Sequence, residues 1–424
     1  MSNVVQLPRP QRLRPSPVRL GHYIRVGHND HKEVTHLLAE GERGYLGLVV
    51  DPRYVHRHRD MITQAGTMGL DIILDPKSHA AAFVGGFTSS LGTLPWGLGR
   101  QSALSDFAGN EGMQRADEIA AFVLTHDISA VLAPTHLITG PNDPWFDADR
   151  RVATRLRSLL PGRGLFYSLA VPMQALRDAD LRAALVEGLR GVDVDALWLK
   201  IENFGADATG DKVRAYIEAA TDFHALGIPV VADHASGIPA LALMAFGGVG
   251  GSAHGIMMLE GFKASSWRRP STGSPRLPAP RTYVHGLDLL VPKADAARLI
   301  EHSTRVRAQH ACRDPQCCPR GYRDMLDQPI RHYLHRRARE VEALSATPFA
   351  VRPAFLMENS VRPRSDALAA AAALDLGDER LARSLADKNR HMGRLRGALA
   401  NLAEGWEPQT VAQAPLSRPQ REDR

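Results

Sequence analysis

The feature that most constrains this chain is a repeat of short apolar runs, each ending in polar residues and followed by a stretch with helical spacing. Buried parallel strands that alternate with helices give this pattern. Strands are predicted at 45–51, 70–75, 129–134, 165–171, 196–203, 229–234 and 248–254, with a less marked eighth at 22–26. Helices are predicted at 53–65, 113–125, 148–160, 173–189, 212–226 and 239–246. Seven or eight such units favour a closed (β/α)8 barrel of the TIM type over an open sheet.

The length of the chain indicates additions to this barrel. A (β/α)8 barrel takes about 250 residues, and the chain has 424. We expect the barrel at 21–262, a basic zinc-binding segment at 263–345 and a helical extension at 346–405. In the extension, Ser365 and Asp366 offer a helix N-cap, and the apolar spacing that follows predicts two amphipathic helices broken at Gly377.

The two ends of the chain and one long uncharged stretch bear on its environment. The first twenty residues hold four arginines, four prolines and no acid, so we expect mobile tails at 1–20 and, by similar polarity, at 406–424. Residues 237–259 are long enough to span a membrane, but Pro239, the five glycines from Gly247 to Gly255, Ser252 and His254 indicate a buried helix followed by a buried strand. The chain has only three cysteines and shows no signal-like leader, and both features favour the cytoplasm.

Polar residues follow several of the predicted strands, where a barrel builds its active site. These residues are Asp51, Asp75, His136, Lys200, Glu202, Asn203, Asp233, His234, Ser252 and His254. We expect Asp75, Asp233 and His254 to be catalytic, and Lys200, Glu202, Asn203 and His234 to bind substrate. A structural role is the alternative for the carboxylates, with Asp233 capping the helix that follows it.

Positive charge is concentrated late in the chain. Residues 263–339 hold 16 Lys and Arg against 6 Asp and Glu, a local balance of +10, whereas the whole chain carries +6. Arg268 and Arg269 beside an aromatic residue suit phosphate contacts with base stacking. We expect nucleic acid to bind here and at Arg336 and Arg337; a solvated basic loop is the alternative.

All three cysteines lie in one short segment that also holds histidines. Thiolate and imidazole ligands together are typical of a tetrahedral structural zinc. The candidate ligands are Cys312, Cys317, Cys318, His310, His332 and His335. We expect zinc on the three cysteines and His335, although the usual Cys-x2-Cys knuckles are absent and adjacent cysteines seldom share one ion. His310 in place of one cysteine, or a reduced cluster without metal, are the alternatives.

This combination of features resembles the tRNA-guanine transglycosylase superfamily, whose relatives include enzymes that insert 7-deazaguanine bases into DNA. The family is a (β/α)8 barrel with a zinc subdomain near its last strands, and its Cys-x-Cys-x2-Cys segment precedes a helix containing Tyr-Leu-His. In this chain Tyr333-Leu334-His335 follows the cysteines. The match covers residues 230–340, and the earlier barrel only through strand count and Asp75.

The resemblance implies exchange of a purine or 7-deazaguanine base in tRNA or DNA. In the family one strand-end aspartate attacks the sugar, a second handles protons, and an Asp-Ser-Gly-Gly motif holds the base. Here Pro76 follows Asp75, paired glycines occur only at Gly85-Gly86 in the long loop 76–110, and the last strand carries His254 at the nucleophile position. Asp233 on the preceding strand is then the replacement, and Asp75 and Asp233 are expected to flank the sugar.

Two other functions fit the same residues. Lys200 in Leu199-Lys200-Ile201-Glu202 would face the same side of a strand as Glu202. A lyase or aldolase acting on a small molecule could use its amine as a nucleophile. Alternatively, a barrel without a nucleophile would be a platform that only binds nucleic acid.

Overall fold

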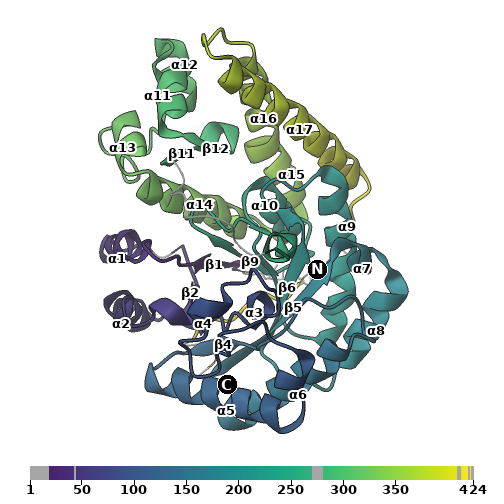
Figure 1. The fold of residues 1–424 in the computed structure, drawn as a ribbon. Coiled ribbons are helices and arrows are strands. Elements are labelled where there is room, and N and C mark those ends of the chain that lie inside the picture. The colour runs from purple at the N-terminus through teal and green to yellow at the C-terminus, as the bar shows by residue number, and fades with distance from the viewer. Residues whose placement is uncertain (1–18, 43, 270–279, 408–411, 419–420, 422–424) are drawn as a thin grey trace, which may run out of the picture.

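The computed structural model describes residues 19–42, 44–269, 280–407, 412–418 and 421. Eight parallel strands form a closed barrel, in which β9 pairs with β1 (Figure 1). The strands are β1 Gly21–Arg25, β2 Gly47–Val50, β3 Asp71–Leu74, β4 Ala130–Leu132, β5 Gly164–Pro172, β6 Ala196–Glu202, β8 Val230–Asp233 and β9 Gly251–Gly255. The predicted (β/α)8 barrel is therefore confirmed, and each predicted strand overlaps an observed one.

Helices surround the barrel in the order that the sequence indicates. They are α1 His31–Ala39, α2 Arg59–Thr67, α5 Gly109–Thr125, α6 Pro144–Leu159, α7 Met173–Arg177, α8 Ala179–Leu189, α9 Gly210–Ala220, α10 Gly237–Ala245 and α14 Pro329–Ala346. The single helix expected at 173–189 is divided at Asp178, whose carboxylate accepts hydrogen bonds from the first backbone N–H groups of α8.

Helix α14 completes the ring, since it packs against both α1 and α10. The barrel therefore does not end at 262, as the predicted domain boundary has it. Residues 256–328 are inserted between its last strand and its last covering helix. The insertion separates β9 from α14 by more than the usual loop length. The sequence pattern therefore does not show that this strand and this helix form one unit of the barrel.

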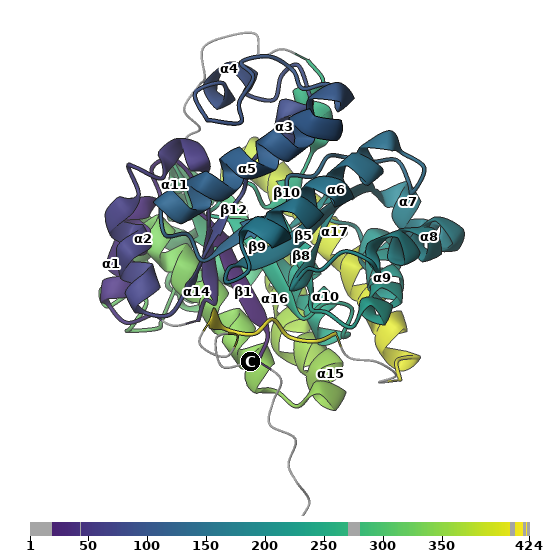
Figure 2. The same cartoon turned by 90° about the horizontal axis from the view of Figure 1, so that it is seen from below.

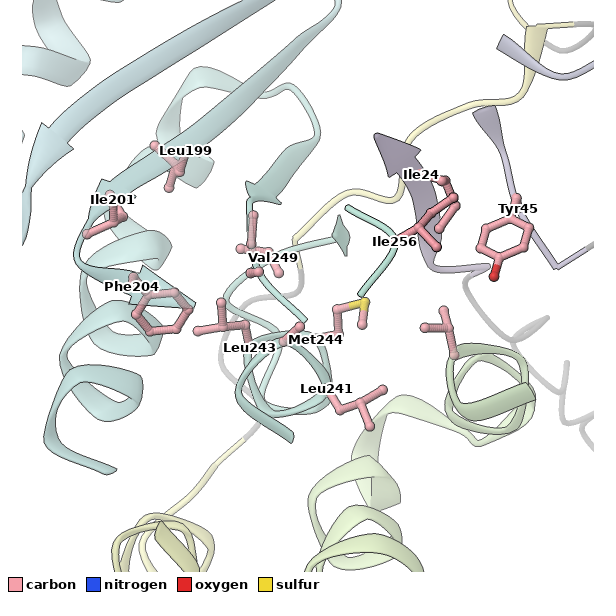
Figure 3. Packing of buried hydrophobic residues seen from close by; sticks show 14 of the residues in the cluster. Ile24, Tyr45, Leu199, Ile201, Phe204, Leu241, Leu243, Met244, Val249 and Ile256 are labelled. Atoms are coloured by element: carbon pink, nitrogen blue, oxygen red, sulfur yellow. The ribbon is translucent and has the colours of Figure 1, made fainter. Parts of the chain in front are cut away.

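Side chains alternate between the barrel axis and the helices along each strand. On β6, Leu199 and Ile201 face outward into the main hydrophobic core, near Phe204 and Leu243 of α10 (Figure 3). Trp198 faces inward and fills the axis with residues of the other strands. Lys200 shares the inward parity of Trp198, so the alternation directs its amine to the barrel axis.

The uncharged stretch 237–259 contains α10 and β9, and both are entirely buried in the protein. The expectation of a buried helix followed by a buried strand is therefore confirmed. In the ranges that the structure describes, no helix combines the length and the apolar character that crossing a bilayer requires.

The inserted residues contribute to two small two-stranded sheets and form three helices. β10 Gly261–Phe262 pairs with β7 Phe204–Gly205, which follows β6, and β11 Arg281–Val284 pairs with β12 Leu289–Pro292. Helices α11 Lys293–Glu301, α12 Thr304–His310 and α13 Tyr322–Asp327 lie at one side of the molecule beyond α14 (Figure 1). The β7–β10 sheet joins the insertion to the segment that follows β6.

The extension contains α15 Arg352–Leu356, α16 Arg362–Ala372 and α17 Glu379–Glu404. Two helices separated near Gly377 are confirmed, and the longer one packs against α9. The helical segment begins earlier than the predicted cap at Ser365, and a π-helical turn joins α15 to α16. Pro363 in the first turn of α16 lacks an N–H group, so the ordinary hydrogen-bond pattern is interrupted there.

The two ends of the chain differ from the expected mobile tails where the structure describes them. Residues 1–18 lie outside the described ranges; Leu20 is buried, and its N–H group donates to Ser345 Oγ at 2.7 Å. The described C-terminal residues run beneath the N-terminal end of the barrel (Figure 2). Ala412 N–H donates to the carbonyl of Gly247, and Arg421 forms an ion pair with buried Asp71. This tail is packed against the barrel.

Candidate active site at the barrel mouth

Arg25 organises the C-terminal mouth of the barrel. Its Nε and Nη2 atoms donate to the two carboxylate oxygens of Asp233 at 2.7 and 2.5 Å, and its Nη1 donates to Asp75 Oδ2 at 2.5 Å. All three side chains are buried. Asp75 and Asp233 therefore share one rim, as predicted, but a guanidinium group binds both of them.

The surrounding cations keep these carboxylates ionised. Burial acts to raise the pKa of Asp75, but Lys77 and Arg25 hold it well below its ordinary value. Burial opposes ionisation of Asp233 too, and Arg25, His234 and Lys200 lower its pKa below the ordinary range. Both groups are poor proton acceptors at neutral pH, so they act as fixed negative charges.

Lys200 lies next to this pair and is 1% exposed. Its Nζ is 3.5 Å from Asp233 Oδ2 and 5.7 Å from the centre of the Phe262 ring. Burial lowers the pKa of Lys200 to about 8, although Asp233 and Asp75 act in the opposite direction. Roughly a tenth of such an amine is neutral at pH 7, against less than about one in a thousand for an exposed lysine.

Two residues that follow β3 extend the site. Lys77 has a left-handed backbone (φ 62°), and its N–H and Nζ both donate to Asp75 at 3.0 Å. His79 is buried, and its pKa is held well below the ordinary value by burial and then by Lys200. His79 is therefore a neutral imidazole near the amine. We call Arg25, Asp75, Lys77, Lys200 and Asp233 the mouth cluster.

An apolar layer covers the mouth cluster. Phe262 and Ala264 pack on Ala170 of β5, together with Phe83 and Trp267. The predicted loop glycine Gly85 fits against this layer, because a Cβ atom there would lie 2.0 Å from the carbonyl oxygen of Arg269. The small residue thus permits close approach of two chain segments, and Lys200 is closed off from solvent in this conformation.

Three other predicted site residues lie apart from the mouth cluster. Glu202 is at the edge, with Oε1 3.9 Å from Arg268 Nη2. Asn203 is exposed, and its backbone N–H donates to the Phe262 carbonyl at 2.7 Å. His254 faces the helices, where its Nδ1 is 3.2 Å from the hydroxyl of Tyr333. The expectation that His254 joins the catalytic carboxylates is wrong, because its neighbour Ala253 takes the inward position.

Sequence reasoning missed Arg25, Lys77 and His79. The signal for Arg25 is an arginine within the apolar run His22-Tyr23-Ile24-Arg25-Val26, at the end of the least marked predicted strand. A charged residue at an inward position of a barrel strand needs a partner of opposite charge. Lys77 and His79 carried no such signal, since the loop 76–110 has no clear periodicity.

A second group of polar residues lies in the insertion, away from the barrel mouth. Cys312, Cys317, Cys318 and His332 are all buried, and one ligand atom from each lies within 4.8 Å of the others. His332 Nε2 is 3.0 Å from the carbonyl oxygen of Tyr283, so Nε2 carries the hydrogen. Its Nδ1 faces the sulfur atoms of Cys317 and Cys318 at 3.3 and 3.4 Å. Three thiols and an oriented imidazole suit a tetrahedral metal ion.

The predicted ligand His335 is not part of this group. Its Nδ1 lies 3.0 Å from Glu42 and its Nε2 lies 3.4 Å from Glu40, on the side of α14 that packs against α1. His332, one turn earlier on the same helix, takes the fourth position. His310 is also buried and lies outside the group of four.

The predicted nucleic-acid-binding arginines divide into two kinds. Arg268 and Arg269 are exposed beside the cover of the barrel mouth. Arg336 is partly buried and 3.7 Å from Asp314. Arg337 is buried, with Nη1 2.9 Å from both Asp288 and Glu340. Arg337 therefore stabilises the interior, and its assignment to a phosphate-binding surface is wrong.

Comparisons with known proteins add little to this geometry. No protein-family model and no curated protein matches the chain. Among solved structures, QR15, an aldolase, is similar with 10% identity and a TM-score of 0.35, over 60% of this chain and 96% of that one. A type I 3-dehydroquinate dehydratase from Clostridium difficile is similar with 8% identity and a TM-score of 0.37, over 59% of this chain and 91% of that one. A GH18 chitinase from Pseudoalteromonas aurantia is similar with 13% identity and a TM-score of 0.35, over 58% of this chain and 94% of that one. These values are too low to support a functional argument.

Proposed function

We propose that the protein is a lyase of the aldolase type, in which the Lys200 amine forms an imine with the carbonyl group of a small-molecule substrate. One observation carries this proposal: a lysine amine is buried at the active end of a (β/α)8 barrel, with its pKa lowered to about 8. Buried lysines with lowered pKa values are suited to nucleophilic attack, because the neutral amine is the reacting form.

The proposed reaction follows from the groups around the amine. Lys200 Nζ attacks the carbonyl carbon, the oxygen takes a proton, and loss of water leaves a protonated imine. Loss of the proton from a β-hydroxyl group then breaks the Cα–Cβ bond, releasing an aldehyde and leaving an enamine. The enamine takes a proton at carbon, and water hydrolyses the resulting imine to free the second carbonyl product and the amine.

The residues of the site have distinct parts in this scheme. Asp75 and Asp233 are ionised and stabilise the positive charge of the imine. His79 is buried and neutral, with its ring centre 5.9 Å from that of Phe262, so one ring nitrogen is free to accept the proton of the β-hydroxyl group. Arg25 fixes both carboxylates through its fork-shaped guanidinium group. The apolar cover must move to admit substrate.

Reductive trapping tests this proposal. The protein is incubated with a panel of aldehydes and ketones plus sodium cyanoborohydride, and intact mass is measured. We expect one stable adduct per chain, lost in Lys200→Met. Lys77→Met is the matched control, because it removes a neighbouring amine of the mouth cluster and should keep the adduct. Equal adduct formation by both variants would contradict the proposal.

A second candidate is the base-exchanging transglycosylase acting on tRNA or DNA. The observation that favours it is the position of the Cys3His group, in an insertion between the last strand and the last helix of the barrel. Against it, both proposed carboxylates are ion-paired with Arg25. Labelled guanine or 7-deazaguanine should exchange into tRNA or duplex DNA, and Asp233→Asn should abolish this. Nucleic-acid binding without exchange would instead indicate a binding platform.

We also propose that the Cys3His group holds a structural zinc ion. Thiolate sulfur and imidazole nitrogen are preferred ligands of zinc, and a closed set of four leaves no open position for catalysis. The group connects α14 to the strand β11 through His332 and the Tyr283 carbonyl. Metal analysis of the purified protein should give one zinc per chain, and Cys312→Ser should reduce it.

A further inference from the structure

A cavity of about 600 Å³ lies beside the mouth cluster, and the imine chemistry proposed for Lys200 does not use it. Its walls come from the loops after β8 and β9, the β11–β12 hairpin, α14 and α17. Phe262 separates it from Lys200, since one ring lines the cavity and also lies 5.7 Å from the amine. A volume of this size is typical of sites for small molecules.

His234 lines this cavity and holds a buried hydrogen-bond acceptor. Its Nδ1 is 3.2 Å from the carbonyl oxygen of Leu259, so Nδ1 carries the hydrogen and donates it. The ring is neutral, because burial and then Arg25 lower the pKa of His234 to about 3. The Nε2 atom is therefore an unprotonated acceptor, and it is buried with no partner among the described residues. A buried acceptor without a partner is costly, and a ligand donor would satisfy it.

The rest of the lining suits a neutral ligand with several hydroxyl groups. Glu260 uses Oε1 to accept the Tyr333 hydroxyl at 2.5 Å, which leaves its Oε2 available as a second acceptor. Phe262, Trp267 and Tyr283 line the cavity and present aromatic surface to the C–H groups of a ligand. The charged residues nearly balance, with Asp207, Glu260 and Asp288 against Lys263, Arg281, Arg337 and Lys388.

Backbone strain is concentrated at the same walls. Four non-glycine residues that line the cavity have left-handed backbones: His234 (φ 57°), Met257 (φ 58°), Leu259 (φ 56°) and Asp288 (φ 47°). Such conformations cost about 1–3 kcal/mol each and persist where the surrounding structure requires them, often at ligand sites. The strain at His234 and Leu259 holds the two partners of the Nδ1 hydrogen bond in place.

We infer that this cavity binds the hydroxylated part of the substrate, which is then a polyhydroxylated aldehyde or ketone of the sugar type. One hydroxyl group donates to His234 Nε2 and another to Glu260, while the carbonyl end reaches past Phe262 to Lys200. This inference rests on the proposed function, because it assigns a class of substrate to the same site. His234 follows Asp233 directly, so ligand in the cavity lies next to the mouth cluster.

The test uses probes without a carbonyl group, because these bind in the cavity but cannot form an imine. Xylitol and sorbitol are titrated into the full-length protein and its Lys200→Met variant by calorimetry. We expect saturable binding in both. No saturable binding of either polyol would overturn the inference.

Two substitutions of His234 separate the role of Nε2 from that of Nδ1. His234→Asn tolerates the left-handed backbone and keeps a donor near the Nδ1 position, but lacks the Nε2 acceptor. His234→Gln places an acceptor near Nε2. Affinity for the polyol should fall about tenfold in the first variant and stay within about threefold in the second. Unchanged affinity in His234→Asn would contradict the role of Nε2.

A variant on the opposite wall guards against loss of folding at His234. Leu290 of β12 is partly exposed and lines the cavity, so Leu290→Trp should narrow the cavity and weaken polyol binding. If polyols bind but no carbonyl compound is trapped, the proposed function fails and the cavity assignment stands. If carbonyl compounds are trapped at Lys200 and polyols do not bind, only the substrate class fails.

Discussion

Replacement of Arg25 by methionine tests how the mouth cluster is held together. The substitution leaves the buried carboxylates of Asp75 and Asp233 without their shared guanidinium partner. Removing one member of a buried ion pair costs about 3–5 kcal/mol of the free energy of unfolding. Arg25 makes contacts to two carboxylates, so we expect a loss toward the upper end of that range, measured by urea denaturation.

Arg151→Met is the matched control for this loss. Arg151 pairs with Asp147 on the surface of α6, where both side chains are about half exposed or more. Surface ion pairs of this kind contribute at most about 1 kcal/mol to the free energy of unfolding. Equal losses for Arg25→Met and Arg151→Met would show that the pairing in the barrel mouth does not stabilise the fold as we infer.

The same position has a second effect, on the amine. The Arg25 cation helps to lower the pKa of Lys200 below its ordinary value. Arg25→Lys keeps the positive charge but not the fork-shaped group, so its effect on the pKa of Lys200 should be smaller than that of Arg25→Met. Reductive trapping should increase with pH around a midpoint near 8 in the wild type, because only the neutral amine reacts. In Arg25→Met the pH midpoint of trapping should be higher. Each pH unit by which the midpoint rises lowers trapping at pH 7 about tenfold. An unchanged midpoint would refute the coupling.

Three further outcomes follow from the structure. Cys317→Ser should lose bound zinc and melt at a lower temperature, because the ligand group links the insertion to α14; metal content and a thermal melt check this. Truncation after residue 407 should lower the free energy of unfolding by about 1–3 kcal/mol, since Asp71 is then buried without Arg421. For the second candidate function, which acts on nucleic acid, charge reversal of exposed Arg268 and Arg269 should weaken binding of different DNA sequences equally and reduce its salt dependence; salt-independent binding would contradict that candidate.

The barrel itself could be predicted because strand periodicity is a local property. Apolar runs with polar ends located all eight strands, and the placement of strand ends in a barrel put Asp75 and Asp233 on one rim. The prediction for His254 failed because side chains alternate between the two faces of a strand. The predicted strand end was correct to one residue, but a shift of one residue moves a side chain to the other face.

The remaining errors concern contacts between distant segments. His332 and His335 both follow the cysteines, and only the packing of α14 against α1 shows that His335 belongs with Glu40 and Glu42. The sequence around Arg337 predicts an exposed basic helix. Its partner Asp288 lies in the β11–β12 hairpin, many residues earlier in the chain. Such pairings depend on tertiary structure, which the spacing of residues along the helix does not specify.

Mapping the trapped adduct tests the central claim most directly. After reduction with a hydroxylated aldehyde, the protein is digested and its peptides are analysed by mass spectrometry. The account predicts a single modified residue, Lys200, at close to one adduct per chain. Absence of an adduct on Lys200, or adducts spread over exposed lysines such as Lys263 and Lys293, would contradict the assignment of Lys200 as the nucleophile.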